Sequence, residues 1–221
     1  MSPTFLSRLA RTSLCGVLAL APLAVPASAA PINDKFKSSV ASFVSEHLDD
    51  WVAVYKDFHT HPELGLQETR SAGIIAAELR TLGFEVTEGV GQTGVVGILR
   101  NGKGPLVMVR ADMDALPLQE KTGLDYASTV QTDWRGENTY VMHACGHDAH
   151  MAIFLATAQT LVDMKKDWKG TLMFVAQPAE EGGGGASKMM ADDIFGKFGV
   201  PDYGFALHVG PSAYDTVQIV K

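Results

Sequence analysis

The sequence has few cysteines, no long run of basic residues and only one long run of apolar residues. It has two cysteines, 18 basic against 25 acidic residues and a formal net charge of −7, so nucleic acid is a poor candidate partner. One long apolar run extends from Leu14 to Val25, which is too short for a membrane-spanning helix of about 20 residues. Hydrophobic residues make up 46% of the chain and charged residues 19%, a balance that excludes global disorder and predicts a folded core.

The apolar run lies in a segment typical of a secretory signal peptide. Arg8 and Arg11 precede the run, and the small residues "ASA" at 27–29 follow it. We therefore expect cleavage after Ala29, which gives a signal peptide over 1–29 and a mature domain over 30–221. This predicts a periplasmic or secreted protein with no membrane attachment after cleavage. An uncleaved membrane anchor is the alternative.

Cleavage would leave Cys145 as the only cysteine of an exported protein, in a compartment where thiols oxidise. A buried, inert thiol is one explanation. The other is a metal ligand, because a bound metal holds a cysteine as thiolate and restricts its reaction with other thiols.

Helical and strand-like patterns alternate along the chain. Apolar spacing predicts helices over 35–59, 68–82, 147–167 and 186–195, and strands over 84–89, 94–101, 105–112, 170–177, 203–209 and 216–221. The runs at 170–177 and 203–209 are apolar enough to be buried on both faces, which is typical of parallel strands. The pattern predicts a three-layer α/β/α domain with a mostly parallel sheet.

Residues of the kinds that bind metals follow three of these predicted strands. The carboxyl ends of parallel strands meet at one edge of a sheet, where ligands bind in such folds. A fourth segment, "HACGHDAH" at 143–150, opens a predicted helix. Each segment alone is weak evidence, since isolated histidines and acidic pairs are common in turns, but their coincidence predicts one site. The strand-end residues are Asp112, Asp114, Glu180, Glu181 and His208.

Within that site, Cys145 and His147 form a short Cys-x-His pair suited to zinc-like ions. The stretch "QPAEEGGGG" at 177–185 places two carboxylates side by side. Neighbouring residues of an extended chain point in opposite directions, so we expect one glutamate to bind a cation and the other to accept a proton from an activated water. A phosphate-binding loop is excluded, because no GK[ST] ending follows and carboxylates at the loop entrance would repel phosphate. A Cys145 nucleophile is disfavoured by the surrounding carboxylates.

Five segments in order resemble the metallo-amidohydrolases that include aminoacylases, hippurate hydrolases and auxin-conjugate hydrolases, within a clan that also holds dinuclear metallo-carboxypeptidases. They are "DFHTHPELGLQETRSAG", "RADMDALPLQE", "MHACGHDAHMA", "QPAEEGGGGA" and "ALHV". The resemblance implies a zinc-peptidase-like catalytic domain with two divalent metal ions (Zn, Mn, Co or Ni). It also implies Cys145, His147, Glu181 and His208 as metal ligands, Glu180 as general base and Asp114 as the residue that orients the metal site. Asp112 stands where related carboxypeptidases place a ligating histidine, and it is left out of the ligand set.

The resemblance implies hydrolysis of the amide bond of N-acyl amino acids or related conjugates. Two alternatives stay open: a dipeptidase or carboxypeptidase of the same clan, and an inactive metal-binding fragment. Family members are longer and continue into a lid or dimerisation domain. We therefore expect this chain to match the N-terminal half only, to expose an apolar sheet edge, and to belong to a homodimer in its full-length form.

Overall fold

The computed structural model describes residues 34–213 and 216–220. Its elements follow one another as expected for an α/β domain. In chain order they are α1 (Asp34–Thr60), α2 (Thr69–Thr81), β1 (Glu85–Val90), β2 (Gly94–Asn101), β3 (Leu106–Asp112), β4 (Gln131–Trp134), β5 (Glu137–Tyr140), α3 (His147–Asp163), β6 (Gly170–Gln177), α4 (Gly185–Ala191), α5 (Ile194–Phe198) and β7 (Tyr203–Ala206).

The central sheet has the strand order β1-β2-β6-β3-β7. Strand β2 pairs antiparallel with both β1 and β6, whereas β6 with β3 and β3 with β7 are parallel pairs. Four of these five strands therefore run in one direction, which confirms the prediction of a mostly parallel sheet. The three parallel strands end at the same edge, and this places the segments that follow them close together.

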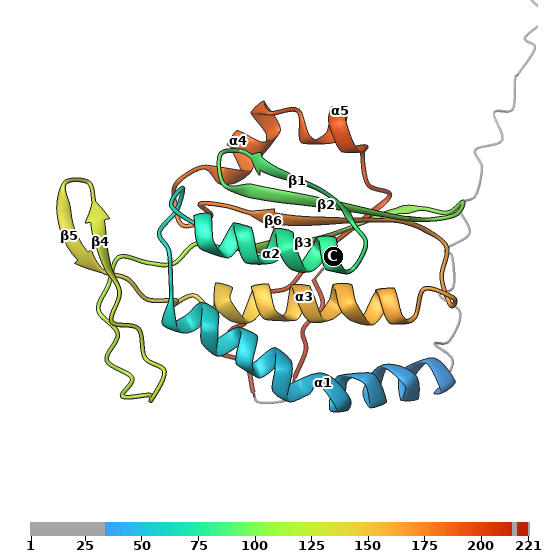
Figure 1. Cartoon of the computed structure of the whole chain (residues 1–221), viewed down its shortest axis with the longest axis horizontal. Helices are drawn as coiled ribbons and strands as arrows, with labels where there is room; N and C mark the ends of the chain where they lie inside the picture. The colour runs from blue at the N-terminus through green and yellow to red at the C-terminus, as the bar shows by residue number, and fades with distance from the viewer. Residues whose placement is uncertain (1–33, 214–215, 221) are drawn as a thin grey trace, which may run out of the picture.

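Helices cover both faces of the sheet, so the predicted three-layer architecture is confirmed (Figure 1). Helices α2 and α3 lie on one face, α4 and α5 on the other, and α1 packs outside α3. Alternate residues of β6 divide between the two faces, as the two-residue period of a strand requires. Phe174 and Ala176 join the core beneath α2 and α3, while Met173 and Val175 join the core beneath α4 and α5.

The prediction of a buried strand over 203–209 is wrong in both its length and its burial. Only Tyr203–Ala206 forms a strand, and all four residues are exposed, because β7 is the edge strand of the sheet. The strand expected over 216–221 is also wrong for the described residues 216–220, which have no regular structure. The expected apolar edge is present, since Phe205 is 61% exposed.

Two local features differ from the expected pattern. The helix predicted over 186–195 is two helices, because Asp193 has φ +57° and its carboxylate accepts a hydrogen bond from the Gly196 amide at 3.2 Å, which starts a new helix. A hairpin, β4–β5, was not expected. Its two-residue turn has positive φ at Arg135 and Gly136, and this turn type is usually recognised from Asn-Gly or Asp-Gly.

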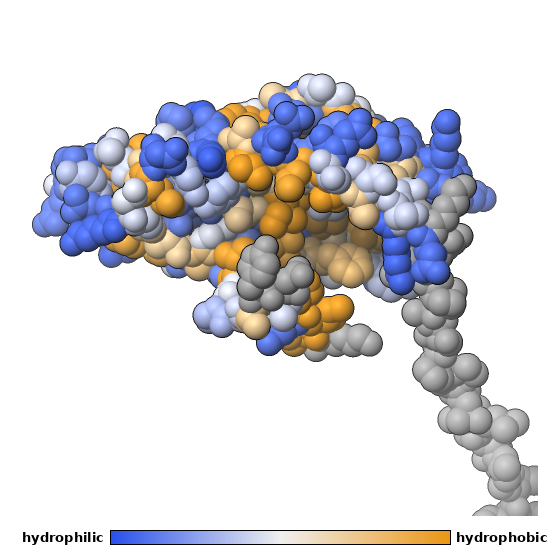
Figure 2. All heavy atoms as spheres, turned by 90° about the horizontal axis from the view of Figure 1, so that it is seen from below, coloured by the Kyte–Doolittle hydropathy of each residue, from blue (hydrophilic) through white to orange (hydrophobic). Residues whose placement is uncertain are grey.

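An apolar cavity of about 530 Å³ lies between α3 and the β3–β7 edge. Its wall includes Val107, Val109, Ile153, Phe154, Trp168 and Phe205. Figure 2 shows apolar side chains around this hollow, beside the C-terminal segment. Ile153 is 40% exposed because it faces the hollow.

The predicted signal peptide over 1–29 lies outside the described residues. Within the part of the chain that the structure describes, no helix combines the length and the apolar content needed to cross a membrane.

Candidate metal centre

Four segments that are far apart in the sequence converge beyond the carboxyl ends of the parallel strands. Donor atoms of Cys145, His147 and His208 all lie within 4.8 Å of one another. The Cys145 Sγ is 3.4 Å from Nε2 of His208. Nε2 of His147 is 3.9 Å from Glu180 Oε2 and 3.9 Å from Glu181 Oε1. The structure thus brings together all four predicted ligands and the predicted base.

Gly146 allows Cys145 and His147 to reach the same point. It adopts φ +80° immediately before α3, a conformation that favours glycine. A side chain there would also collide with Val209, because an ideal Cβ would lie 2.2 Å from Val209 Cγ2. The tight turn therefore holds the start of α3 against the segment that carries His208.

His147 has the surroundings expected of a metal ligand. Its side chain is fully buried, yet neither ring nitrogen has a hydrogen-bond partner among the described residues. Oδ1 of Asp114 lies 3.3 Å from Nδ1, so this carboxylate backs the ring while Nε2 faces the two glutamates. Unpaired buried nitrogens are costly, and a cation at Nε2 would remove that cost. The donor set of sulfur, imidazole and carboxylate fits a zinc-like ion.

Glu180 and Glu181 lie in a turn rather than in extended chain. Both carboxylates lie 3.9 Å from the same nitrogen of His147, so the extended chain expected for this stretch is wrong, while the separate roles of the two glutamates stay a prediction. They still differ in exposure: the Glu180 side chain is 41% exposed and that of Glu181 25%. Glu180 is therefore the more accessible of the two to a water molecule or a substrate.

The electrostatics of the site indicate a place for a cation. Burial raises the pKa of Cys145, and the Glu181 and Glu180 carboxylates raise it further, to about 11. Burial alone would lower the pKa of His147, but Asp114, Asp112 and Glu181 outweigh it and raise that pKa. Without a cation the thiol stays protonated at neutral pH, which argues against Cys145 as a nucleophile.

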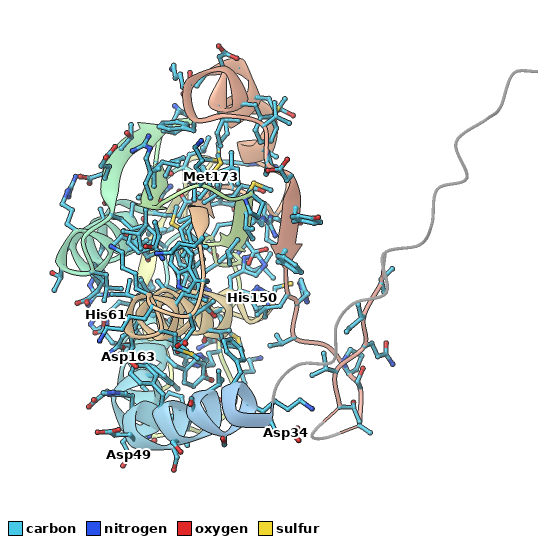
Figure 3. The ribbon with its side chains drawn as sticks, turned by 90° about the vertical axis from the view of Figure 1, so that its right-hand side faces the viewer. Asp34, Asp49, His61, His150, Asp163 and Met173 are labelled. Carbon is cyan, nitrogen blue, oxygen red and sulfur yellow. The ribbon has the colours of Figure 1, made fainter. Side chains whose placement is uncertain are left out.

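Asp112 and His150 form a clamp that the sequence pattern did not resolve. The His150 Nδ1 is 2.6 Å from Asp112 Oδ1, and the Val209 amide donates to Nε2 of His150 at 2.9 Å. Both nitrogens of His150 are engaged, and the ring connects α3 to the C-terminal segment (Figure 3). Asp112 also accepts a hydrogen bond from Arg110 at 2.6 Å. Burial would raise the pKa of Asp112, but His150, His147 and Arg110 lower it to about 2.

A second buried network lies next to the site. The His59 Nδ1 is 2.6 Å from Asp148 Oδ2, and its Nε2 is 3.0 Å from Glu120 Oε1. Asp148 follows His147 directly in α3, so the network fixes the end of α1 and the loop at Glu120 against the start of the ligand-bearing helix. The sequence predicts His59 at the end of a helix but does not indicate its role in this network, because Asp148 and Glu120 are too distant along the chain to form a local pattern with it.

Comparison with known proteins assigns the chain to a family. The model for peptidase family M20/M25/M40 matches residues 108–220, just over half of the sequence. The chain belongs to this family. As an M20 family member it is 42% identical over 184 residues to hippurate hydrolase from Campylobacter jejuni, a match that covers 81% of this chain and 45% of the relative.

Two further curated relatives of this M20 chain carry different names. IAA-amino acid hydrolase ILR1-like 5 from Arabidopsis thaliana is 38% identical over 165 residues, covering 74% of this chain and 35% of the relative. Thermostable carboxypeptidase 1 from Saccharolobus solfataricus is 40% identical over 183 residues, covering 81% of this chain and 43% of the relative. The chain spans less than half the length of these relatives.

A solved structure supports the same assignment. The YXEP protein of Bacillus subtilis, described as a dinuclear metal binding peptidase of the M20 family, matches with a TM-score of 0.63 and 34% identity. The match covers 79% of this chain and 44% of that one. The predicted family and fold are thereby confirmed, including the match to part of the relatives' length only.

Proposed function

We propose that this protein is a metal-dependent amidohydrolase that cleaves the amide bond of N-acyl amino acids or related conjugates. The observation that carries the proposal is the convergence of the Cys145, His147 and His208 donor atoms within 4.8 Å, with two glutamates at 3.9 Å from His147. Hippurate hydrolase and an IAA-amino acid hydrolase among the relatives support this class of substrate.

In this proposal Cys145, His147, Glu181 and His208 hold two divalent metal ions, drawn from Zn, Mn, Co and Ni. When bound, such ions polarise a carbonyl and lower the pKa of a water molecule. Asp114 orients His147 through the contact at Nδ1 and holds the turn of the glutamates by accepting a hydrogen bond from the Glu181 amide at 2.9 Å.

Glu180 is the proposed general base. Its carboxylate takes a proton from the attacking water and later delivers it to the nitrogen of the leaving amine, which completes hydrolysis without another proton carrier. The 41% exposure of its side chain leaves it open to both water and substrate.

A carboxypeptidase or dipeptidase is the second candidate, and the carboxypeptidase relative at 40% identity favours it. Both candidates use the same residues and the same amide hydrolysis. Rates on N-benzoyl, N-acetyl and indoleacetyl amino acids, compared with rates on unblocked dipeptides and with added Zn, Mn, Co or Ni, distinguish them.

The two adjacent glutamates provide the test of mechanism. Glu180→Gln should keep bound metal and substrate affinity but lower turnover by about 10²–10⁴-fold, because an amide cannot accept the proton of the water. Glu181→Gln should instead lower metal affinity, since it removes an anionic ligand, and excess metal should restore part of the rate. Metal content and kcat are measured for both variants side by side. Full activity with full metal content in both would reject the site.

We also propose export, based on the signal-like residues 1–29. The mature protein should begin at Ala30 and lie in the periplasm or the medium. N-terminal sequencing of the purified product tests this, and a cytoplasmic protein that retains its first residues would contradict it.

A further inference from the structure

Glu68 is a buried carboxylate next to the site, and neither the ligand set nor the base includes it. It directly precedes α2, is fully buried, and takes part in no ion pair within the described part of the chain. Burial raises its pKa, and the hydrogen bonds it accepts oppose that rise. Burying a carboxylate without a cation costs free energy. The presence of Glu68 at this position therefore needs an explanation, and its two hydrogen bonds suggest one.

Those two bonds reach segments far along the chain. One oxygen accepts the backbone amide of Ala179 at 2.7 Å, and the other accepts the Thr93 hydroxyl at 2.6 Å. Ala179 is the residue immediately before Glu180. Glu68 therefore contacts the main chain that carries the proposed base.

Ala179 is held in an unfavourable backbone conformation. Its φ is +45°, in the left-handed region that is strained for a residue with a Cβ. Its carbonyl accepts the Gly185 amide at 3.1 Å, and Gly65 is packed so closely against it that an ideal Cβ there would lie 3.1 Å from Ala179 Cα. Such a conformation persists only when several contacts impose it.

Two buried carboxylates thus hold the backbone on either side of Glu180. Glu68 accepts the amide before it, and Asp114 accepts the amide after it, from Glu181, at 2.9 Å. The Glu180 side chain itself stays 41% exposed. Its position is therefore set through the main chain.

We propose that Glu68 is a positioning residue that fixes Glu180 by holding the strained Ala179 amide. This inference rests on the proposed function for the role of Glu180, but the hydrogen bond to Ala179 can be tested without catalysis.

The decisive variants separate the two hydrogen bonds of the Glu68 carboxylate, one from the Ala179 amide and one from the Thr93 hydroxyl. Glu68→Met keeps the length of the side chain and removes the acceptor, whereas Glu68→Gln can still accept from Ala179 and donate to Thr93. Thr93→Val is the matched control, because it breaks the other hydrogen bond of the same carboxylate and leaves the Ala179 bond. Glu68→Asp, whose shorter side chain withdraws the acceptor, serves if Glu68→Met does not fold.

The first measurement is hydrogen exchange at the Ala179 amide in the purified protein under native conditions. Exchange should be about tenfold faster or more in Glu68→Met, and close to wild type in Glu68→Gln and Thr93→Val. Unchanged exchange in Glu68→Met and Glu68→Asp would overturn the proposal, whether or not the protein is active.

The second measurement is kcat, KM and metal content with the preferred N-acyl amino acid. Glu68→Met should lower kcat about tenfold or more with little change in KM or bound metal, while Glu68→Gln restores most of it. A kcat loss in Thr93→Val equal to that of Glu68→Met at the same loss of stability would show a merely structural role. If Glu180→Gln leaves kcat unchanged, the proposed function fails, and hydrogen exchange still decides the role of Glu68.

Discussion

Cys145 illustrates how much the surroundings of a residue decide its chemistry. The sequence offered it as an inert thiol, a metal ligand or a nucleophile. The structure places it 3.4 Å from His208 and beside two glutamates that, together with burial, raise its pKa to about 11. A thiol in these surroundings becomes a thiolate at neutral pH only when a cation is bound.

This predicts slow alkylation of Cys145 in the metal-free protein. A pKa raised from 9.0 to about 11 lowers the thiolate fraction at pH 8 about 100-fold, so iodoacetamide should react about 100-fold more slowly than with the unfolded chain. The measurement uses a Cys15→Ser background, which leaves one thiol. Equal rates in the folded and urea-unfolded protein would contradict the prediction.

The residues that converge at the candidate site could be predicted from sequence, whereas the residues that support them could not. Cys145, His147 and Glu180 lie in short motifs whose spacing carries the chemistry. Glu68 and His150 act through partners such as Ala179 and Val209, far along the chain. Only the fold brings such pairs together, so no local pattern indicates them.

At the scale of helices and strands, the buried network of His59 joins three elements. It links the end of α1 to Asp148 at the start of α3 and to Glu120 in the loop before β4. Burial would lower the pKa of His59, but the two carboxylates outweigh this and raise it. The protonated imidazole therefore stabilises the contact between these elements.

The raised pKa fixes the direction of a pH effect. The stabilisation is fully present below the ordinary histidine pKa of 6.5 and is lost as the pH rises through the raised value. The free energy of unfolding of wild type relative to His59→Gln should therefore be largest near pH 6 and fall by at most about 1.4 kcal/mol per pH unit above it. Urea unfolding from pH 6 to 9 measures it, with the half-exposed His61→Gln as control. A difference independent of pH would rule out the charged pairing.

Several elements have nearly the bounds that the sequence predicts. Helix α1 and strands β2, β3 and β6 lie within a residue or two of the expected ranges. Strand β7 has the apolar sequence of a buried strand but lies exposed at the edge, because burial depends on what covers a strand and not on its composition. The hairpin β4–β5 was missed because its Arg-Gly turn is uncommon.

At the scale of the whole molecule, the sheet leaves one apolar wall open to water. Strand β7 and helix α3 border the cavity of about 530 Å³, and Phe205 and Ile153 are partly exposed there. An apolar dye such as ANS should bind this hollow in the native protein and fluoresce. Ile153→Lys should reduce the fluorescence, because a charge at the wall opposes the dye's apolar contacts.

The control for that experiment is Val200→Lys. Val200 is 75% exposed but does not line the cavity, so its substitution should leave dye fluorescence unchanged. Equal fluorescence of wild type and both variants would show that the dye binds elsewhere.

The order of strands in the sheet also sets how the protein can fold. Strand β6 lies at the centre, paired with β2 and β3, both of which come much earlier in the chain. Val95 pairs with Ala176, and Val107 pairs with Tyr203, so each pairing can form only after the later residue has been synthesised. Few pairings of the sheet can therefore form during synthesis. Loops of this length slow the search for the native pairing, and we expect refolding on the order of milliseconds to seconds. The candidate metal centre forms equally late, because Glu181 follows β6 and His208 follows β7, and both strands come late in the chain.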